Sequence, residues 1–175
     1  HNARLHHARN IWLFSFYLAG MGASDVSRMK WSDFQNGRLF YAMGKNNKGD
    51  SLKVPEKAQR IIDQYASQKD DMGLVFPELK GLDSLHDPFT VQMRIKTKLK
   101  AVNDDLKEVA KKAGVTKKIS MHISRHTFGN ISGDTIPVQM LQKLYRHSTV
   151  TTTIGYQSSF INKSADDALD AVIGN

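Results

Sequence analysis

The longest helical pattern in the chain covers residues 88–113, and it limits the possible folds more than any other stretch. Pro88 suits the first turn of a helix, and Gly114 is the residue type that often follows a helix end. The polar positions between them are rich in lysine: Lys96, Lys98, Lys100, Lys107, Lys111 and Lys112. One helix of this length favours a mainly helical protein.

Other segments with helical patterns are residues 8–21, a short stretch after Ser24, and residues 56–68, 121–132, 137–147 and 161–173. Ser24 is the expected N-cap of the second helix. Residues 37–43 and 51–55 are strand-like and flank a turn, which predicts a β-hairpin. Residues 70–87 predict a loop with short helical pieces. We expect one mainly α domain with a small antiparallel β-hairpin.

The charge balance indicates a polyanionic partner. The 175 residues include 25 Lys+Arg and 17 Asp+Glu, a net charge of +8. This excess favours nucleic acid over a membrane, and the alternative is a soluble basic protein with no such partner. The chain has no cysteine, which excludes disulfides, thiolate zinc sites and a cysteine nucleophile. No apolar run is long enough for a membrane span, so we expect a cytoplasmic protein without a membrane partner.

The densest cluster of chemical groups is the stretch MHISRHTF. Its His122 and Arg125 are three residues apart and share one face of a helix. A zinc site fits poorly because Arg125 would repel the ion and no carboxylate is adjacent. Two alternatives stay open: a solvated polar face, or a phosphate site in which a guanidinium fork acts beside a histidine.

A second stretch, KLYRHSTVTTTIGY, places His147 nine residues before Tyr156. A lone tyrosine near the C-terminus is usually a half-buried packing residue, and a nucleophile is the alternative. Residues 148–153 between them are hydroxyl-rich and β-branched, which makes them weak helix formers. Such a segment suits a tyrosine that has to move.

Taken in order, these motifs resemble those of the tyrosine recombinases, or phage integrase family. MHISRHTF resembles the family's His-x-x-Arg box, with His122 and Arg125 at its two positions. KLYRHSTVTTTIGY resembles the second box, in which Leu-Gly-His leads to the tyrosine nucleophile; here His147 and Tyr156 match. The resemblance covers essentially the whole chain, residues 1–175, as a catalytic domain that lacks an upstream core-binding domain.

Two further stretches fit the same family less closely. GKNNKGDSLKVP resembles its β-hairpin with an active-site lysine, which is best matched by Lys45, with Lys48 as the alternative. GMGASDVSRMKWSDF resembles the first box, and Asp25 matches its acidic position. There are two departures: Gly22 stands where the first-box arginine is expected, and Arg146 replaces the glycine before the second-box histidine.

The resemblance implies metal-independent DNA cleavage and rejoining without a cofactor, in site-specific recombination or integration. Tyr156 would attack a backbone phosphate and form a 3′-phosphotyrosine, and Arg125 would clamp that phosphate. His122 would accept the tyrosine's proton, His147 would donate to phosphate oxygens, and Lys45 would protonate the leaving 5′-oxygen. The expected partner is double-stranded DNA, bound by a homotetramer on two duplexes, in the bacterial cytoplasm; the free protein could be a monomer.

Gly22 raises an alternative function. Loss of one donor from a preorganised anion site costs on the order of 10²–10³ in rate. The protein could therefore be a weakened enzyme or a silent DNA-binding member, unless Arg146 replaces the missing cation. An unrelated helical module with structural histidines is a third interpretation. The remaining candidate DNA-phosphate ligands are Lys48, Arg146, Lys96, Lys98, Lys100, Lys117 and Lys118. The predicted helix at 161–173 closes its own core or docks on a neighbouring protomer.

Overall fold

The computed structural model describes residues 2–41, 50–133, 135–145, 147, 149–157 and 172. Within these residues the α-helices are α1 Ala3–Tyr17, α2 Ala23–Arg28, α3 Glu56–Asp63, α4 Pro88–Lys112, α5 Met121–Ser132, α6 Val138–Tyr145 and α7 Val150–Gln157. Short 3₁₀ turns occur at Trp31–Asp33, Ala66–Gln68 and Pro77–Leu79. The predicted mainly α fold with a small antiparallel sheet is confirmed.

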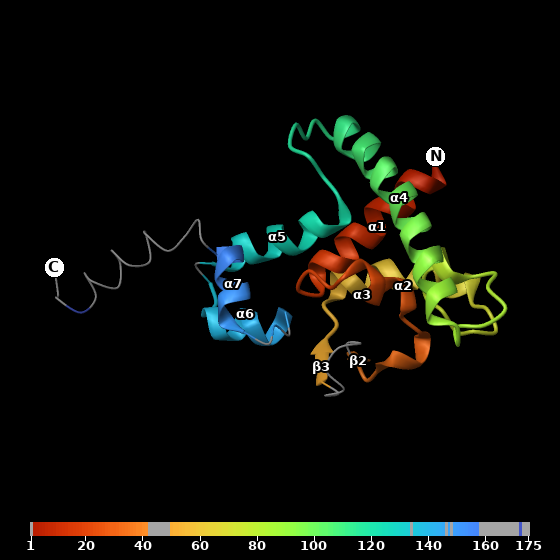
Figure 1. The fold of residues 1–175 in the computed structure, drawn as a ribbon, viewed down its shortest axis with the longest axis horizontal. Coiled ribbons are helices and arrows are strands. Elements are labelled where there is room, and N and C mark those ends of the chain that lie inside the picture. The colour runs from red at the N-terminus through yellow and green to blue at the C-terminus, as the bar shows by residue number, and fades with distance from the viewer. Residues whose placement is uncertain are drawn as a thin grey trace.

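Helix α1 is the centre of the packing, since it contacts α3, α4 and α5 (Figure 1). Its buried residues Ile11 and Phe14 belong to the main hydrophobic core, together with Ile62 of α3 and Leu106 of α4. Helices α5, α6 and α7 form a group at one end of the molecule, on the left in Figure 1. Helix α5 therefore connects the main core to the segment that carries Tyr156.

The long helix was predicted almost to the residue. Asp87 is its N-cap, with carboxylate oxygens that accept from the backbone N–H of Phe89 at 3.1 Å and Thr90 at 3.2 Å. Gly114 follows its C-terminal end with a φ of +69°, a conformation that glycine adopts without a steric cost. No helix in the described ranges is long and apolar enough to cross a membrane.

The sheet has three strands, β1 Phe34–Gln35, β2 Arg38–Tyr41 and β3 Asp50–Lys53, in antiparallel order β1-β2-β3. The predicted hairpin of β2 and β3 is confirmed, and the pairing of Leu39 with Leu52 sets its register. Strand β1 was not predicted, because two residues are too few to show an alternating pattern.

Several helices differ from the sequence-based prediction. Helix α1 begins at Ala3 and ends at Tyr17, whereas residues 8–21 were predicted, and α7 forms over residues that were expected to be weak helix formers. Helix α2 begins at Ala23 after Gly22 and has no side-chain cap hydrogen bond, so the expected N-cap role of Ser24 is wrong. Helix α3 ends at Asp63, and the rest of the predicted helix is a separate 3₁₀ turn, Ala66–Gln68. Helix ends are the part of a helix that residue type predicts least well. The predicted C-terminal helix lies outside the described residues, apart from the exposed Val172.

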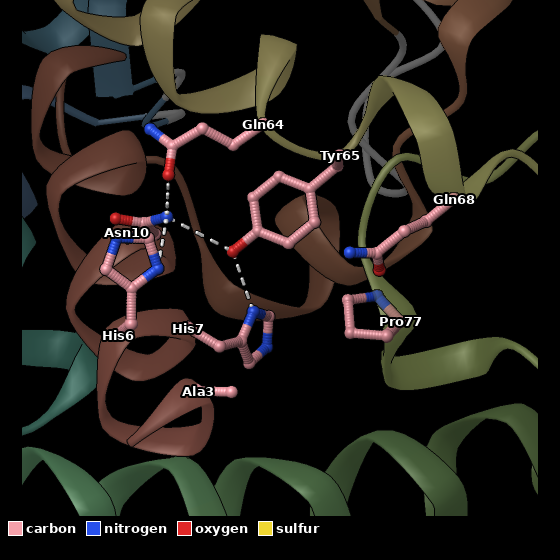
Figure 2. Close-up of a pocket in the computed structure, with 8 residues that line it drawn as sticks. All are labelled: Ala3, His6, His7, Asn10, Gln64, Tyr65, Gln68 and Pro77. Atoms are coloured by element: carbon pink, nitrogen blue, oxygen red, sulfur yellow. Dashed lines mark hydrogen bonds between the residues drawn. The ribbon is translucent and has the colours of Figure 1, made fainter. Parts of the chain in front are cut away.

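A polar network ties the start of α1 to the segments that follow α3 (Figure 2). His7 Nδ1 lies 2.8 Å from the Tyr65 hydroxyl, and His7 Nε2 lies 2.6 Å from a buried carboxylate oxygen of Glu78. Burial raises the pKa of Tyr65 to about 12, so its hydroxyl stays protonated. The adjoining cavity of about 450 Å³ is lined by Ala3, His6, His7, Asn10, Gln64, Tyr65, Gln68 and Pro77.

Gly20 allows the turn after α1 to touch the backbone of α5. It has a φ of +67°, and a Cβ atom at this position would lie 2.4 Å from the Cα of Arg125. Only a residue without a side chain fits such an approach. The turn that follows α1 therefore fixes where Arg125 stands.

We expect Gly20→Ala to destabilise the protein by several kcal/mol, since it adds a backbone clash to the cost of a left-handed conformation, about 1–2 kcal/mol. Gly37→Ala is the matched control, because Gly37 has a φ of +70° but, among the described residues, no atom beyond its chain neighbours lies within 4 Å of the place that its Cβ would take. Urea unfolding of both variants measures the difference. Equal losses of stability would show that the contact with Arg125 is unimportant.

Candidate active site

Arg125 lies at the centre of a cluster built by three segments. From α5, its guanidinium donates to the carbonyl oxygen of Gly20 at 3.2 Å and to that of Tyr145 at 2.8 Å. Nη2, the nitrogen that donates to Tyr145, also lies 2.9 Å from His147 Nε2. The guanidinium also stacks 3.9 Å from the centre of the Tyr145 ring. Arg125 is therefore held rigidly while it stays partly exposed.

His147 is placed by the end of α6. Its backbone N–H donates to the carbonyl oxygen of Gln142 at 3.2 Å, and the Gln142 side chain donates to its carbonyl oxygen at 3.2 Å. Its ring Nδ1 lies 3.0 Å from the hydroxyl of Thr153 on α7. Burial, and then the charge of Arg125, lower the pKa of His147 below the ordinary histidine value. The imidazole is therefore neutral at neutral pH.

Tyr156 stands on α7 with its ring inside the same cluster. It stacks on His126 with ring centres 4.7 Å apart, and it meets the Tyr145 ring edge-on at 5.1 Å. The His147 ring is 5.6 Å away, and the Arg125 guanidinium carbon is 5.9 Å from the ring centre. The Tyr156 ring therefore packs against the same groups that surround Arg125 and His147.

His122 is joined to the cluster through His126. The two imidazole rings lie 4.7 Å apart, edge to face, one helical turn apart on α5. Partial burial, followed by the charges of His126 and Arg125, lowers the pKa of His122. His122 is exposed, and His126 lies between it and the Tyr156 ring.

Sequence reasoning assigned no role to His126, Tyr145 or Thr153. The spacing of His126 from His122 was a usable signal, because residues four apart meet on a helix. Tyr145 gave no such signal, since it stands where the resembling motif has leucine. Burial raises the pKa of Tyr145 well above the ordinary value, and its hydroxyl donates to the carbonyl oxygen of Arg125.

The remaining sequence-predicted residues are not in this cluster or are not described. Lys45, Lys48 and Arg146 lie outside the described residues. The five candidate DNA-binding lysines of known position are exposed on α4 and on the connection to α5: Lys96, Lys98, Lys100, Lys117 and Lys118. From helical periodicity, Lys96 and Lys100 share one flank of α4 and Lys98 lies on the other.

The surroundings of Gly22 and the possible metal ligands complete the description of the site. Gly22 directly precedes α2, and the Asp25 carboxylate folds back to within 3.1 Å of where its Cβ would be. Among the described residues, no group of three or more His, Asp or Glu side chains is arranged to hold a metal ion.

The family is shown by comparison with known proteins. The model of the phage integrase family matches residues 4–162, and the chain therefore belongs to this family. Its family and fold indicate a tyrosine recombinase catalytic domain. No curated protein sequence matches the chain significantly.

Solved structures show the same fold. XerA recombinase is similar with a TM-score of 0.64 and 18% identity, over 93% of this chain and 63% of that one. XerH site-specific recombinase bound to palindromic difH substrate, in a post-cleavage complex, has a TM-score of 0.62 at 18% identity over 97% of this chain. A pre-cleavage complex of XerH with difH substrate has the same score and identity over 94% of this chain. The chain spans 47% of each XerH chain.

Gly129 of α5 lets α7 approach closely enough for Tyr156 to enter the cluster. A Cβ at Gly129 would lie 2.8 Å from Tyr156 Cβ and 3.2 Å from its carbonyl oxygen. We expect Gly129→Ala to lower the free energy of unfolding by about 1–3 kcal/mol, because α7 must move away.

Gly155→Ala on α7 is the control, since among the described residues no atom outside its own helix turn lies within 4 Å of the position that a Cβ would occupy there. Alanine is the better helix former, so this variant should keep or raise stability, by up to about 1 kcal/mol. Thermal and urea unfolding measure both variants. A Gly129→Ala protein as stable as wild type would contradict the close packing of α7 on α5.

Proposed function

We propose that this chain cleaves and rejoins DNA through a 3′-phosphotyrosine bond made by Tyr156. The observation that carries the proposal is the convergence of Arg125, His147 and Tyr156 from three separate segments. A guanidinium, an imidazole and a phenol within one cluster are the groups that a phosphoryl transfer needs when protein side chains alone stabilise the phosphate.

In the proposed reaction, the Tyr156 oxygen bonds to phosphorus while the bond from phosphorus to the 5′-oxygen breaks. The phenolic proton passes to a base; His122 is the candidate, and His126 lies between the two rings. Arg125 binds the non-bridging oxygens, and Lys45 protonates the leaving oxygen. Attack by a second 5′-hydroxyl reverses these steps, so the bond energy is conserved and no cofactor is consumed.

The proposed partner is double-stranded DNA, with a homotetramer holding two duplexes during exchange. The net charge of +8 and the exposed lysines of α4 support binding to phosphates without sequence reading. The XerH structures of the same fold contain difH substrate. A bacterial cytoplasmic location fits this partner, and the upstream core-binding domain stays a prediction.

A second candidate function is DNA binding with weak or no cleavage. Gly22 favours it, because the first-box position lacks a cation that would stabilise the phosphate. The two candidates differ in whether a covalent adduct forms.

The deciding experiment uses a pool of nicked duplex suicide substrates with a randomised core. We expect an adduct that survives denaturing electrophoresis, and Tyr156→Phe should abolish it. Arg125→Lys should slow its formation on the order of 10²–10³-fold, because lysine cannot replace the bidentate fork. If the wild-type chain forms no adduct although it binds the pool, the silent DNA-binding function is correct.

Gly22→Arg tests the missing cation directly. The backbone at Gly22 has a φ of −59°, which any residue can adopt. A side chain added there would contact the Asp25 carboxylate, which is the end of a flexible side chain, so arginine is sterically acceptable. We expect adduct formation to rise on the order of 10²–10³-fold, with no gain in the matched Gly22→Ala control. If Arg146→Ala changes nothing while Gly22→Arg raises the rate sharply, Arg146 does not replace the missing arginine.

A further inference from the structure

The two candidate phosphate ligands are bound to each other in the free protein. Nη2 of Arg125 lies 2.9 Å from Nε2 of His147, and the other ring nitrogen of His147 lies 3.0 Å from the hydroxyl of Thr153. Thr153 is completely buried, and it lies one turn before Tyr156 on α7. These contacts form a chain from the guanidinium, through the imidazole, to the helix of the nucleophile.

The chemistry of the guanidinium fixes the hydrogen positions along this chain. Arginine has donors only, so His147 Nε2 must be the acceptor and carries no hydrogen. A neutral imidazole with a bare Nε2 carries its hydrogen on Nδ1, which donates to the hydroxyl oxygen of Thr153.

We propose that Thr153 is a positioning residue that holds His147 in the Nδ1–H tautomer, so that Arg125 and His147 stay paired until a DNA phosphate separates them. This deepens the proposed function, on which it rests. Arg125 selects this tautomer because it can only donate, and the Thr153 hydroxyl stabilises it by accepting the Nδ1 hydrogen. In the free protein, Arg125 and His147 therefore bind each other and not a phosphate.

Opening of the pair changes the protonation of His147. While the Nδ1 hydrogen stays bonded to Thr153, His147 can donate to a phosphate oxygen from Nε2 only after that nitrogen gains a second proton for the ring. Among the described residues, the charged or titratable groups around the imidazole are Arg125 from α5, Tyr145 from α6 and Tyr156 from α7. Arg125 opposes the extra proton in the free protein, whereas a bound phosphate anion favours it.

Thr153 also links this step to the nucleophile. Residues three apart face the same side of a helix, so Thr153 and Tyr156 move together when α7 moves.

The first test observes the imidazole in the free chain. Long-range ¹H–¹⁵N NMR spectra of the histidine side chains, assigned with His147→Gln, report which ring nitrogen carries the hydrogen. We expect the Nδ1–H tautomer in wild type, a weaker preference for it in Thr153→Val, where the acceptor for the Nδ1 hydrogen is lost, and the wild-type preference in Thr153→Ser. Thr151→Val is the matched control, because Thr151 is exposed on the same helix, and it should keep the wild-type spectrum. An Nε2–H tautomer in wild type, or an unchanged spectrum in Thr153→Val, overturns the proposal.

The second test follows adduct formation with the suicide substrates between pH 6 and pH 9. Uptake of one proton predicts that the wild-type rate falls by up to about tenfold per pH unit above the pKa of His147. Thr153→Val should shift this profile, and Thr151→Val should not. Identical profiles in all three proteins would overturn the link to catalysis. If no protein forms an adduct, the proposed function fails while the NMR result still decides the role of Thr153.

Discussion

The placement of the Arg125 guanidinium is the constraint on which the candidate site depends. Its donors are directed to the carbonyl oxygens of Gly20 and Tyr145 and to the imidazole of His147. A guanidinium has a fixed planar set of donors, so these acceptors can satisfy it only if α5, the turn after α1 and the end of α6 keep their relative positions. One side chain thus joins the main core to the helices that carry His147 and Tyr156.

Close backbone approaches make this arrangement possible. At Gly20 the turn after α1 touches α5, and at Gly129 α7 rests on α5. Tyr145 completes the site from α6, with its ring under the guanidinium and its hydroxyl on the carbonyl oxygen of Arg125. The site is therefore as rigid as the packing of its helices, while His122 remains at the exposed edge.

Local sequence signals predicted the parts of the fold that depend on local interactions. Helix α4 could be bounded in advance, since Pro88 and Gly114 act through their own backbone conformations. Strand β1 and the early end of α3 could not, because they depend on the neighbours that each segment meets. The assumed cap at Ser24 was wrong for the same reason, since residue type alone does not decide where a helix begins.

The sequence by itself determined the class of the protein. The reaction needs certain residue types in a certain order, and this order can be read directly from the sequence. It indicated a tyrosine recombinase through four residues: His122, Arg125, His147 and Tyr156. The absence of an arginine at Gly22 is likewise a fact of the sequence. Only the tertiary structure decided how these groups meet: Arg125 paired with His147, Thr153 behind the imidazole, and His126 between His122 and Tyr156. These contacts join residues on different helices, and their geometry follows from how the helices pack, which no local pattern specifies.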